Sequence, residues 1–187
     1  MVPAVRVLGI DPGSRHTGYA VIEERESRLR LLAIGTVSPG DSRPLPERLA
    51  AIHEGLGEVL VRTAPDAVSV EEVFHAENAR SALVLGQARG VALLAAALRG
   101  VEVHEYTAGE IKRAVAGNGR AGKEQVGRMV ALVLGGAVPG DEHACDAAAA
   151  AICHLHRARL PAAVLAPAKP LAALSKRRPG FGRGGRR

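Results

Sequence analysis

The chain has 187 residues, of which 47% are hydrophobic and 2% aromatic, and it carries two cysteines and a net charge of +6. This length gives one well-buried core rather than two ordinary domains, and two cysteines eight residues apart fit neither a disulfide framework nor a common zinc pattern. The uncharged apolar stretches are shorter than the roughly 20 residues that cross a bilayer, and the N-terminus lacks a secretory pattern. We therefore expect a cytoplasmic protein without a membrane partner.

The positive charge is unevenly distributed along the chain. Residues 1–160 hold 18 Lys and Arg against 19 Asp and Glu, whereas residues 161–187 hold seven basic residues and no acidic one. The second segment mixes Pro, Ala, Gly and Arg without a period, so we predict a disordered tail after one domain over residues 1–160. Its Arg-Gly ending suits contacts with phosphate, although a tail that only aids solubility would have the same composition.

The first half of the chain predicts three strands and a helix. Residues 5–10 are apolar on both faces, which is typical of a central strand, and they end at a turn that begins with Asp11. Residues 18–23 and 29–36 predict two further strands, which we expect to form an antiparallel meander with the first. Apolar residues then recur at steps of four and three over residues 45–59, as in an amphipathic helix.

The second half predicts two more strands and four helices. Asn78 is a suitable N-cap for a long helix to Leu98, whose apolar surface covers more than one face, so this helix can pack on the core and on a partner. Thr107 and Glu110 form a capping box for another helix. The remaining elements are strands over residues 67–73 and 101–106, and helices over residues 122–134 and 141–159. This order predicts an α/β fold with a mixed sheet of five strands.

Two strands end in carboxylates. Asp11 follows the first strand and Glu71 and Glu72 end the fourth, which places these side chains at the carboxyl edge of the sheet, where α/β proteins commonly carry their sites. An Asp before Pro-Gly is also an ordinary turn residue. Because successive strand residues point to opposite faces, only one of the two glutamates can share the side of Asp11.

A polar pair stands near the start of the last predicted helix. His143 and Asp146 are three residues apart and share a face, and Ala150 and Cys153 continue this stripe toward the sheet. Taken singly, His143 could be a partly exposed histidine without a ligand, and Asp146 could be an acidic residue that the helix dipole favours near the start of a helix. Together with the strand-end carboxylates they could bind two hard divalent cations. Clustered carboxylates can lie close together when such cations neutralise them, and two metal ions promote phosphodiester hydrolysis.

Four separated motifs resemble one family. The segments GIDPGSRHTGYAVI, VEEVFHAENARSALVLGQARG, EIKRAVAGNGRAGKEQV and HACDAAAAAICH, in this order and spacing, are similar to the RuvC family of Holliday junction resolvases over nearly all of residues 5–157. The resemblance implies an RNase H-like fold, a homodimer, dependence on two Mg²⁺ or Mn²⁺ ions, and paired symmetric nicks in four-way DNA junctions. It also implies partnership with the RuvAB branch-migration complex, and it makes the helix after Asn78 the dimer element.

The resemblance assigns roles to individual positions. It implies metal binding by Asp11, Glu71, Asp146 and His143, and junction contacts by Lys112 and Lys123. Many family members have Asp at the position of His143, and a neutral imidazole would favour Mn²⁺ more. Beyond the resemblance, the stretch around the two lysines also contains Arg113 and Arg120, and Phe74 follows the predicted site. We expect both arginines to contact DNA and Phe74 to stack on an unpaired base.

Three other functions fit parts of the sequence. Nucleases that process ribosomal RNA precursors share the GxDxG strand but lack the VEEVF and GQARG segments. Actin-like ATPases and sugar kinases open with a similar strand, but they need two such domains. A junction-binding module without catalysis would not need the four candidate ligands, which are all present.

Overall fold

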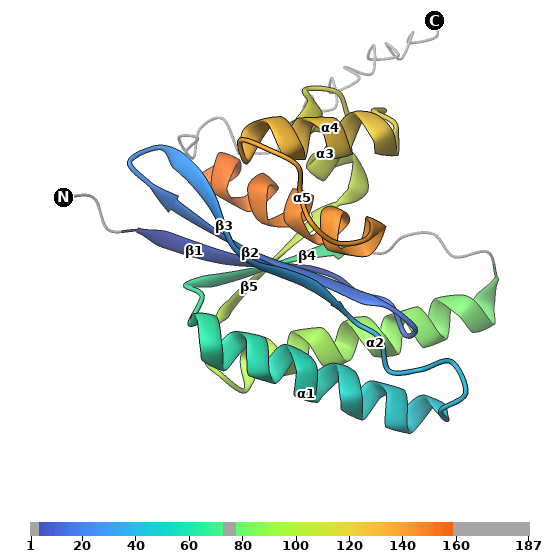
Figure 1. Ribbon diagram of the computed structural model, residues 1–187. Coiled ribbons are helices and arrows are strands. Elements are labelled where there is room, and N and C mark those ends of the chain that lie inside the picture. Colours follow the sequence, from blue (N-terminus) through green and yellow to red (C-terminus); the bar gives the residue numbers. More distant parts are fainter. Residues whose placement is uncertain (1–3, 73–77, 159–187) are drawn as a thin grey trace, which may run out of the picture.

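The computed structural model describes residues 4–72 and 78–158, in which one sheet lies between two layers of helices (Figure 1). The helices α1 and α2 cover one face, and α3, α4 and α5 lie on the other. The elements are β1 (Val5–Asp11), β2 (Thr17–Arg25), β3 (Arg28–Val37), α1 (Leu45–Thr63), β4 (Ala67–Glu72), α2 (Ala79–Ala97), β5 (Glu102–Thr107), α3 (Ala108–Ala116), α4 (Lys123–Val133) and α5 (Glu142–Ala158).

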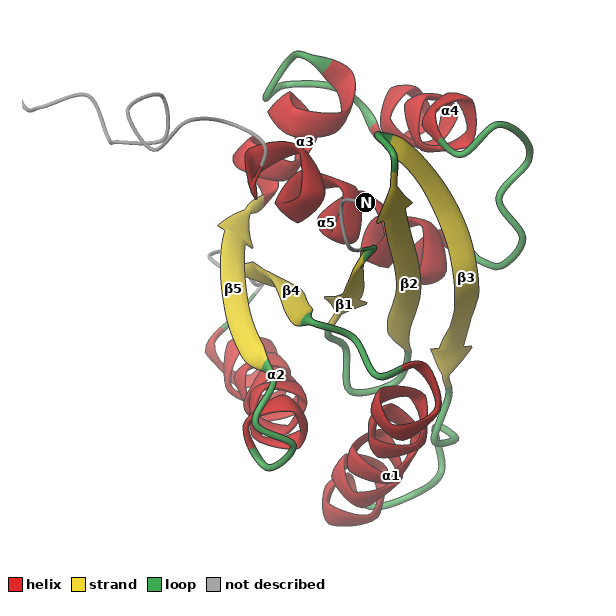
Figure 2. Ribbon diagram, turned by 90° about the vertical axis from the view of Figure 1, so that its left-hand side faces the viewer, coloured by secondary structure: helices red, strands yellow, loops and turns green. Residues whose placement is uncertain are grey.

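The sheet has the strand order β3-β2-β1-β4-β5, which can be followed in Figure 2. The first three strands form the expected antiparallel meander, and β4 and β5 continue in parallel with β1. Strand β1 is central because both of its faces are apolar: Val7 joins the core under α5, whereas Leu8 and Ile10 join the core over α1 and α2. The mixed five-stranded sheet confirms the RNase H-like fold that the resemblance implied.

Helix α5 lies unusually close to the sheet because glycines stand beneath it. A Cβ at Gly9 in β1 would lie 1.9 Å from the backbone oxygen of Ala147, and one at Gly18 in β2 would lie 2.0 Å from that of His143. The Ser69 hydroxyl in β4 donates a buried hydrogen bond of 2.7 Å to the carbonyl of Ala150. Small residues on the facing surfaces of α5 and the sheet thus allow backbone-to-backbone contact and fix the helix over three strands.

The caps agree with the sequence predictions, and most element ends shift by a few residues. The Asn78 side chain accepts from Ser81 N, and Thr107 with Glu110 forms the predicted capping box. The last helix was predicted from residue 141, but it begins at Glu142, because Asp141 lies before it and accepts a hydrogen bond of 3.0 Å from the backbone N–H of Ala144.

Several predictions concern segments that the structure does not describe. Phe74, Val73 at the end of the predicted fourth strand, Arg159 at the end of the last predicted helix, and the tail over residues 161–187 all lie outside the described residues. Within residues 4–72 and 78–158, no helix combines the length and the apolar character needed to span a membrane.

Candidate active site

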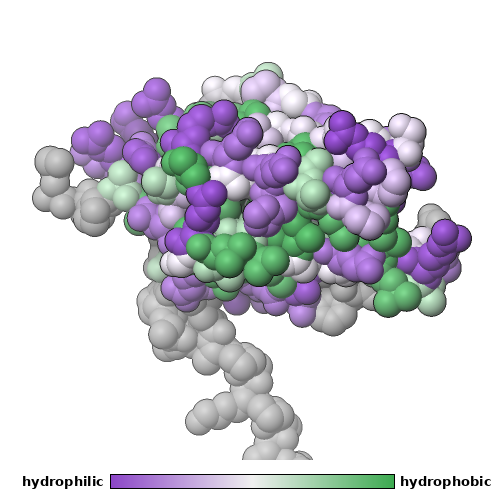
Figure 3. Space-filling model, turned by 90° about the horizontal axis from the view of Figure 1, so that it is seen from below, coloured by the Kyte–Doolittle hydropathy of each residue, from purple (hydrophilic) through white to green (hydrophobic). Residues whose placement is uncertain are grey.

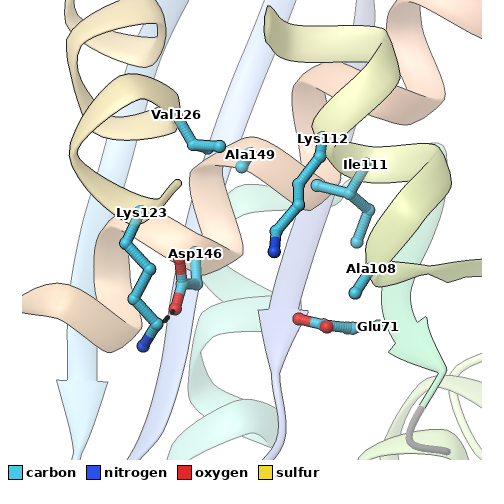
Figure 4. Close-up of a pocket in the computed structure, with 8 residues that line it drawn as sticks. All are labelled: Glu71, Ala108, Ile111, Lys112, Lys123, Val126, Asp146 and Ala149. Atoms are coloured by element: carbon cyan, nitrogen blue, oxygen red, sulfur yellow. Dashed lines mark ion pairs between the residues drawn. The ribbon is translucent and has the colours of Figure 1, made fainter. Parts of the chain in front are cut away.

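Charged side chains from four elements converge on one cavity beside the sheet. Glu71 comes from the end of β4, Asp146 from α5, Lys112 from α3 and Lys123 from the start of α4, and Figure 4 shows all four at the cavity. Apolar side chains complete the lining, among them Ile111, Val126 and Ala149. The cavity therefore brings together two of the predicted metal ligands and both lysines that the resemblance assigns to the DNA.

The other two predicted ligands are in direct contact with each other. Asp11 Oδ2 lies 2.9 Å from His143 Nδ1, so the carboxylate at the end of β1 meets the first turn of α5. The ring of His143 also stacks on His16, with ring centroids 5.4 Å apart, and His16 Nδ1 lies 3.1 Å from Ser38 Oγ. His143 is thus held from two sides, by Asp11 and by His16.

Strand pairing explains why the two halves of the site are neighbours. Strands β1 and β4 are parallel, and their register reaches Ile10 opposite Val70, so Asp11 and Glu71 follow as the next residues at the same edge. Glu71 lines the cavity, whereas Glu72 points to the other face by strand alternation. The cavity lining thus selects Glu71 as the glutamate on the side of α5, in line with the alternation of side chains along a strand.

The carboxylates of the site repel one another in a partly buried environment. Burial, followed by the charges of Asp11 and Asp146, raises the pKa of Glu71 to about 7, against the opposing effect of Lys112 and Lys123. Burial and the charge of Asp11 likewise raise the pKa of Asp146, although Lys123 lies 3.9 Å from it. Burial is the largest cause of both shifts, and the neighbouring carboxylates add to it, so a bound cation would stabilise the charged forms of Glu71 and Asp146.

The raised pKa of Glu71 predicts that its charge destabilises the metal-free fold. Between its ordinary value of 4.5 and about 7 the folded chain keeps a proton that the unfolded chain has lost, so the free energy of unfolding falls as the pH rises through this interval. In EDTA near pH 8, Glu71→Gln should therefore raise the melting temperature by about 2–6 °C, with no gain near pH 4.

Thermal melts at both pH values check this effect. Glu58→Gln, which changes an exposed glutamate on α1, is the matched control and should show no pH-dependent gain. A Glu71→Gln variant that melts at or below the wild-type temperature near pH 8 would contradict the electrostatic cost assigned to Glu71.

The donor set suits hard divalent cations, but the side chains are not arranged around one ion. Within residues 4–72 and 78–158, no three His, Cys, Asp or Glu side chains are grouped so that they could hold a metal as they stand. Asp11 contacts His143, and Asp146 is near Lys123, which also pairs with Glu142. Carboxylate oxygens and one imidazole, gathered where negative charge is unbalanced, nevertheless fit Mg²⁺ or Mn²⁺.

The remaining predicted DNA-binding residues lie outside the cavity lining. Arg113 in α3 and Arg120 in the loop before α4 are exposed, and Arg113 packs beside the loop at Gly119. Phe74 cannot be placed, because it is not among the described residues. Sequence reasoning missed His16, whose only signal was its position in the loop after Asp11, and it missed the close contacts made by Gly9 and Gly18.

Comparisons with known proteins agree on one family. The family model described as "Crossover junction endodeoxyribonuclease RuvC" matches residues 7–154. A relative of that name from Trichlorobacter lovleyi is 52% identical over 156 residues, which cover 83% of this chain and 88% of the relative. One from Azorhizobium caulinodans is 48% identical over 86% of this chain and 94% of its own length.

Solved structures give the same result. "T. thermophilus RuvC in complex with Holliday junction substrate" is 39% identical with a TM-score of 0.78, and the match covers 83% of this chain and 95% of that one. The yeast mitochondrial Holliday junction resolvase Ydc2 is only 14% identical with a TM-score of 0.60, over 82% of this chain and 79% of that one, and supports the fold alone.

Proposed function

The chain belongs to the crossover junction endodeoxyribonuclease RuvC family, as a metal-dependent nuclease that resolves Holliday junctions, and we propose that Asp11, Glu71, His143 and Asp146 bind its catalytic metal ions. The observation that carries this assignment is the convergence of strand-end and helix carboxylates on one cavity with unbalanced negative charge. Two Mg²⁺ or Mn²⁺ ions in such a site supply an activated water and stabilise the leaving oxygen of the phosphodiester.

The protein residues position the ions and the DNA. Asp11 and Glu71 are fixed by neighbouring parallel strands, and His143 and Asp146 by a helix that cannot move away from the sheet without losing its close contacts. His143 binds a metal only in its neutral form, and its replacement of the Asp found in many family members favours Mn²⁺. Asp11 and Asp146 would hold the ions through carboxylate oxygens that here contact His143 and Lys123.

Lys112 and Lys123 are the proposed phosphate contacts closest to the cut. Both line the cavity, where an ammonium group can bind the oxygens of the scissile strand. Lys112→Ala and Lys123→Ala should each weaken junction binding and reduce its salt dependence by about one phosphate contact. Fluorescence anisotropy over a range of salt concentrations measures both effects, and an unaltered slope in the double variant would show that the lysines only neutralise the carboxylates.

We assign further DNA contacts to Arg113, Arg120 and Phe74. Both arginines are exposed on the α3–α4 side of the cavity, where their charges can reach the phosphates of a junction arm. For Phe74 we propose stacking on an unpaired base at the junction centre, because it follows Glu71 by three residues in a chain with few aromatic residues. We also propose that the tail over residues 161–187 adds sequence-independent binding at low salt.

Helix α2 is the proposed dimer element. Leu83, Gly86, Gly90 and Leu94 form one exposed stripe along it, and Leu83 is 71% exposed. Apolar side chains gather on the α1–α2 side of the molecule (Figure 3). A homodimer would cover this stripe and give the twofold symmetry that paired nicks require. In keeping with a DNA substrate we also propose a cytoplasmic location and cooperation with RuvAB.

One assay tests the reaction as a whole. The purified protein is mixed with a labelled four-way junction and with linear duplexes of the same sequence, in EDTA, Mg²⁺ or Mn²⁺. We expect paired, symmetric nicks in the junction alone, and only with metal, with a higher ratio of Mn²⁺ to Mg²⁺ activity for wild type than for His143→Asp. Equal cutting of junction and duplex would contradict junction resolution, and metal-independent cutting would contradict the proposed site.

A further inference from the structure

A second concave surface lies beside the loop that follows Asp11. It is lined by Ser14 and Arg15 from this loop, Arg48 from α1, and the start of α2, which contributes Arg80, Ser81, Val84 and Leu85. We call this surface the arginine groove. It shares the loop with the catalytic site, because Ser14 follows Asp11 by three residues, and it is not part of the cavity that holds Glu71 and Asp146.

Arg48 is held in the groove with part of its guanidinium unpaired. Its Nη1 lies 3.3 Å from both the carbonyl oxygen and the hydroxyl of Ser14, so the side chain is fixed against the loop. Its Nε is buried and has no hydrogen-bond partner among the described residues. The contacts of Arg48 are thus to neutral oxygens of Ser14, so its positive charge is not neutralised at the groove that its side chain lines.

The charges around the groove are also unbalanced. Arg15 pairs with Asp41 at 3.5 Å, but both side chains are more than two-thirds exposed, so this pair contributes little. Within residues 4–72 and 78–158, neither Arg48 nor Arg80 has an ion-pair partner. The first turn of α2 contains no acidic residue, and the positive end of its helix dipole faces the same region.

We propose that the arginine groove binds a phosphodiester of the DNA strand that enters the catalytic site, an inference that rests on the proposed function. One arginine guanidinium group can bind two oxygens of a phosphate through two parallel hydrogen bonds, and the serine hydroxyls can donate further hydrogen bonds. Three residues of chain span at most about 10 Å, and phosphates of one strand follow each other at about 3.4 Å along the helix axis. The groove therefore contacts a phosphate about one to three positions from the cut.

The test compares two double variants with the same loss of charge. Arg15→Ala with Arg80→Ala removes two exposed arginines of the groove and leaves the partly buried Arg48 in place. Arg28→Ala with Arg30→Ala removes two exposed arginines of β3, at the end of the sheet opposite Asp11. Binding of the full-length proteins to a labelled four-way junction is measured by anisotropy in EDTA over a range of salt concentrations.

We expect the groove variant to bind about 5- to 20-fold more weakly near 0.1 M salt and to lose about one to two units of salt slope, with little change in the β3 variant. A scan of single methylphosphonates through the cleaved strand then locates the contact. One substitution near the cut should weaken wild-type binding and have no further effect on the groove variant.

Four results would overturn the inference. Equal losses of affinity in both double variants would show that only the overall charge matters. Unchanged binding of the groove variant would show that the groove does not contact the DNA. A methylphosphonate penalty of full size in the groove variant would place the contact elsewhere. Failure of the wild type to prefer the junction over a matched duplex would overturn the proposed function itself, and the ligand of the groove with it.

Discussion

We expect junction cleavage to fall by about 10³-fold or more when Asp11, Glu71 or Asp146 is replaced by the matching amide, and junction binding to be retained. Each substitution keeps the shape of the side chain and removes one charged oxygen donor from the site. Binding should be retained because the lysines and arginines that we propose as phosphate contacts are unchanged, and because less negative charge faces the DNA.

Single-turnover cleavage and anisotropy on the same preparations separate the two effects. Glu72→Gln is the matched control, because it changes the neighbouring residue on the other face of β4 and should cut at nearly the wild-type rate. If one of the three amide variants cuts at a near wild-type rate with full metal dependence, that residue is not a metal ligand.

Of the substitutions proposed for this protein, Gly9→Ala should lower the free energy of unfolding the most. The new methyl group would lie 1.9 Å from the oxygen of Ala147 and 2.8 Å from the nitrogen of Ala151, both in the backbone of α5. The helix must move away from the sheet, which strains the hydrogen bond from Ser69 and opens the core. We expect a loss of about 3 kcal/mol or more and a melting temperature lower by about 6–12 °C.

The same displacement separates His143 and Asp146 from Asp11. A shift of about 1 Å at a catalytic group can cost about 10²-fold in rate, so cleavage per folded molecule should also fall. Gly127→Ala in α4 is the control, since its Cβ would make only an ordinary contact of 3.8 Å with Cys145 Sγ. A Gly9→Ala protein with wild-type melting and cleavage would show that the close approach of α5 is not required.

The secondary-structure elements and the family could be predicted from patterns along the chain. Asn78 as a cap, and Thr107 with Glu110 as a capping box, act within four residues of chain, so their patterns can be read without the fold. The apolar residues of β1 likewise predicted a central strand, because burial on both faces requires apolar side chains on both. The four motifs supplied the proposed ligand positions through resemblance rather than through geometry.

How the distant residues of the two sites come together depends on the packing of the fold. Asp11 and His143 are 132 positions apart, and their contact depends on how closely α5 approaches the sheet at Gly9 and Gly18. The arginine groove joins three segments that are far apart along the chain. Periodicity and capping report interactions between near neighbours along the chain, whereas both sites are created by packing between distant segments. The close contacts of the glycines and the unpaired arginines can be recognised only when that packing is known.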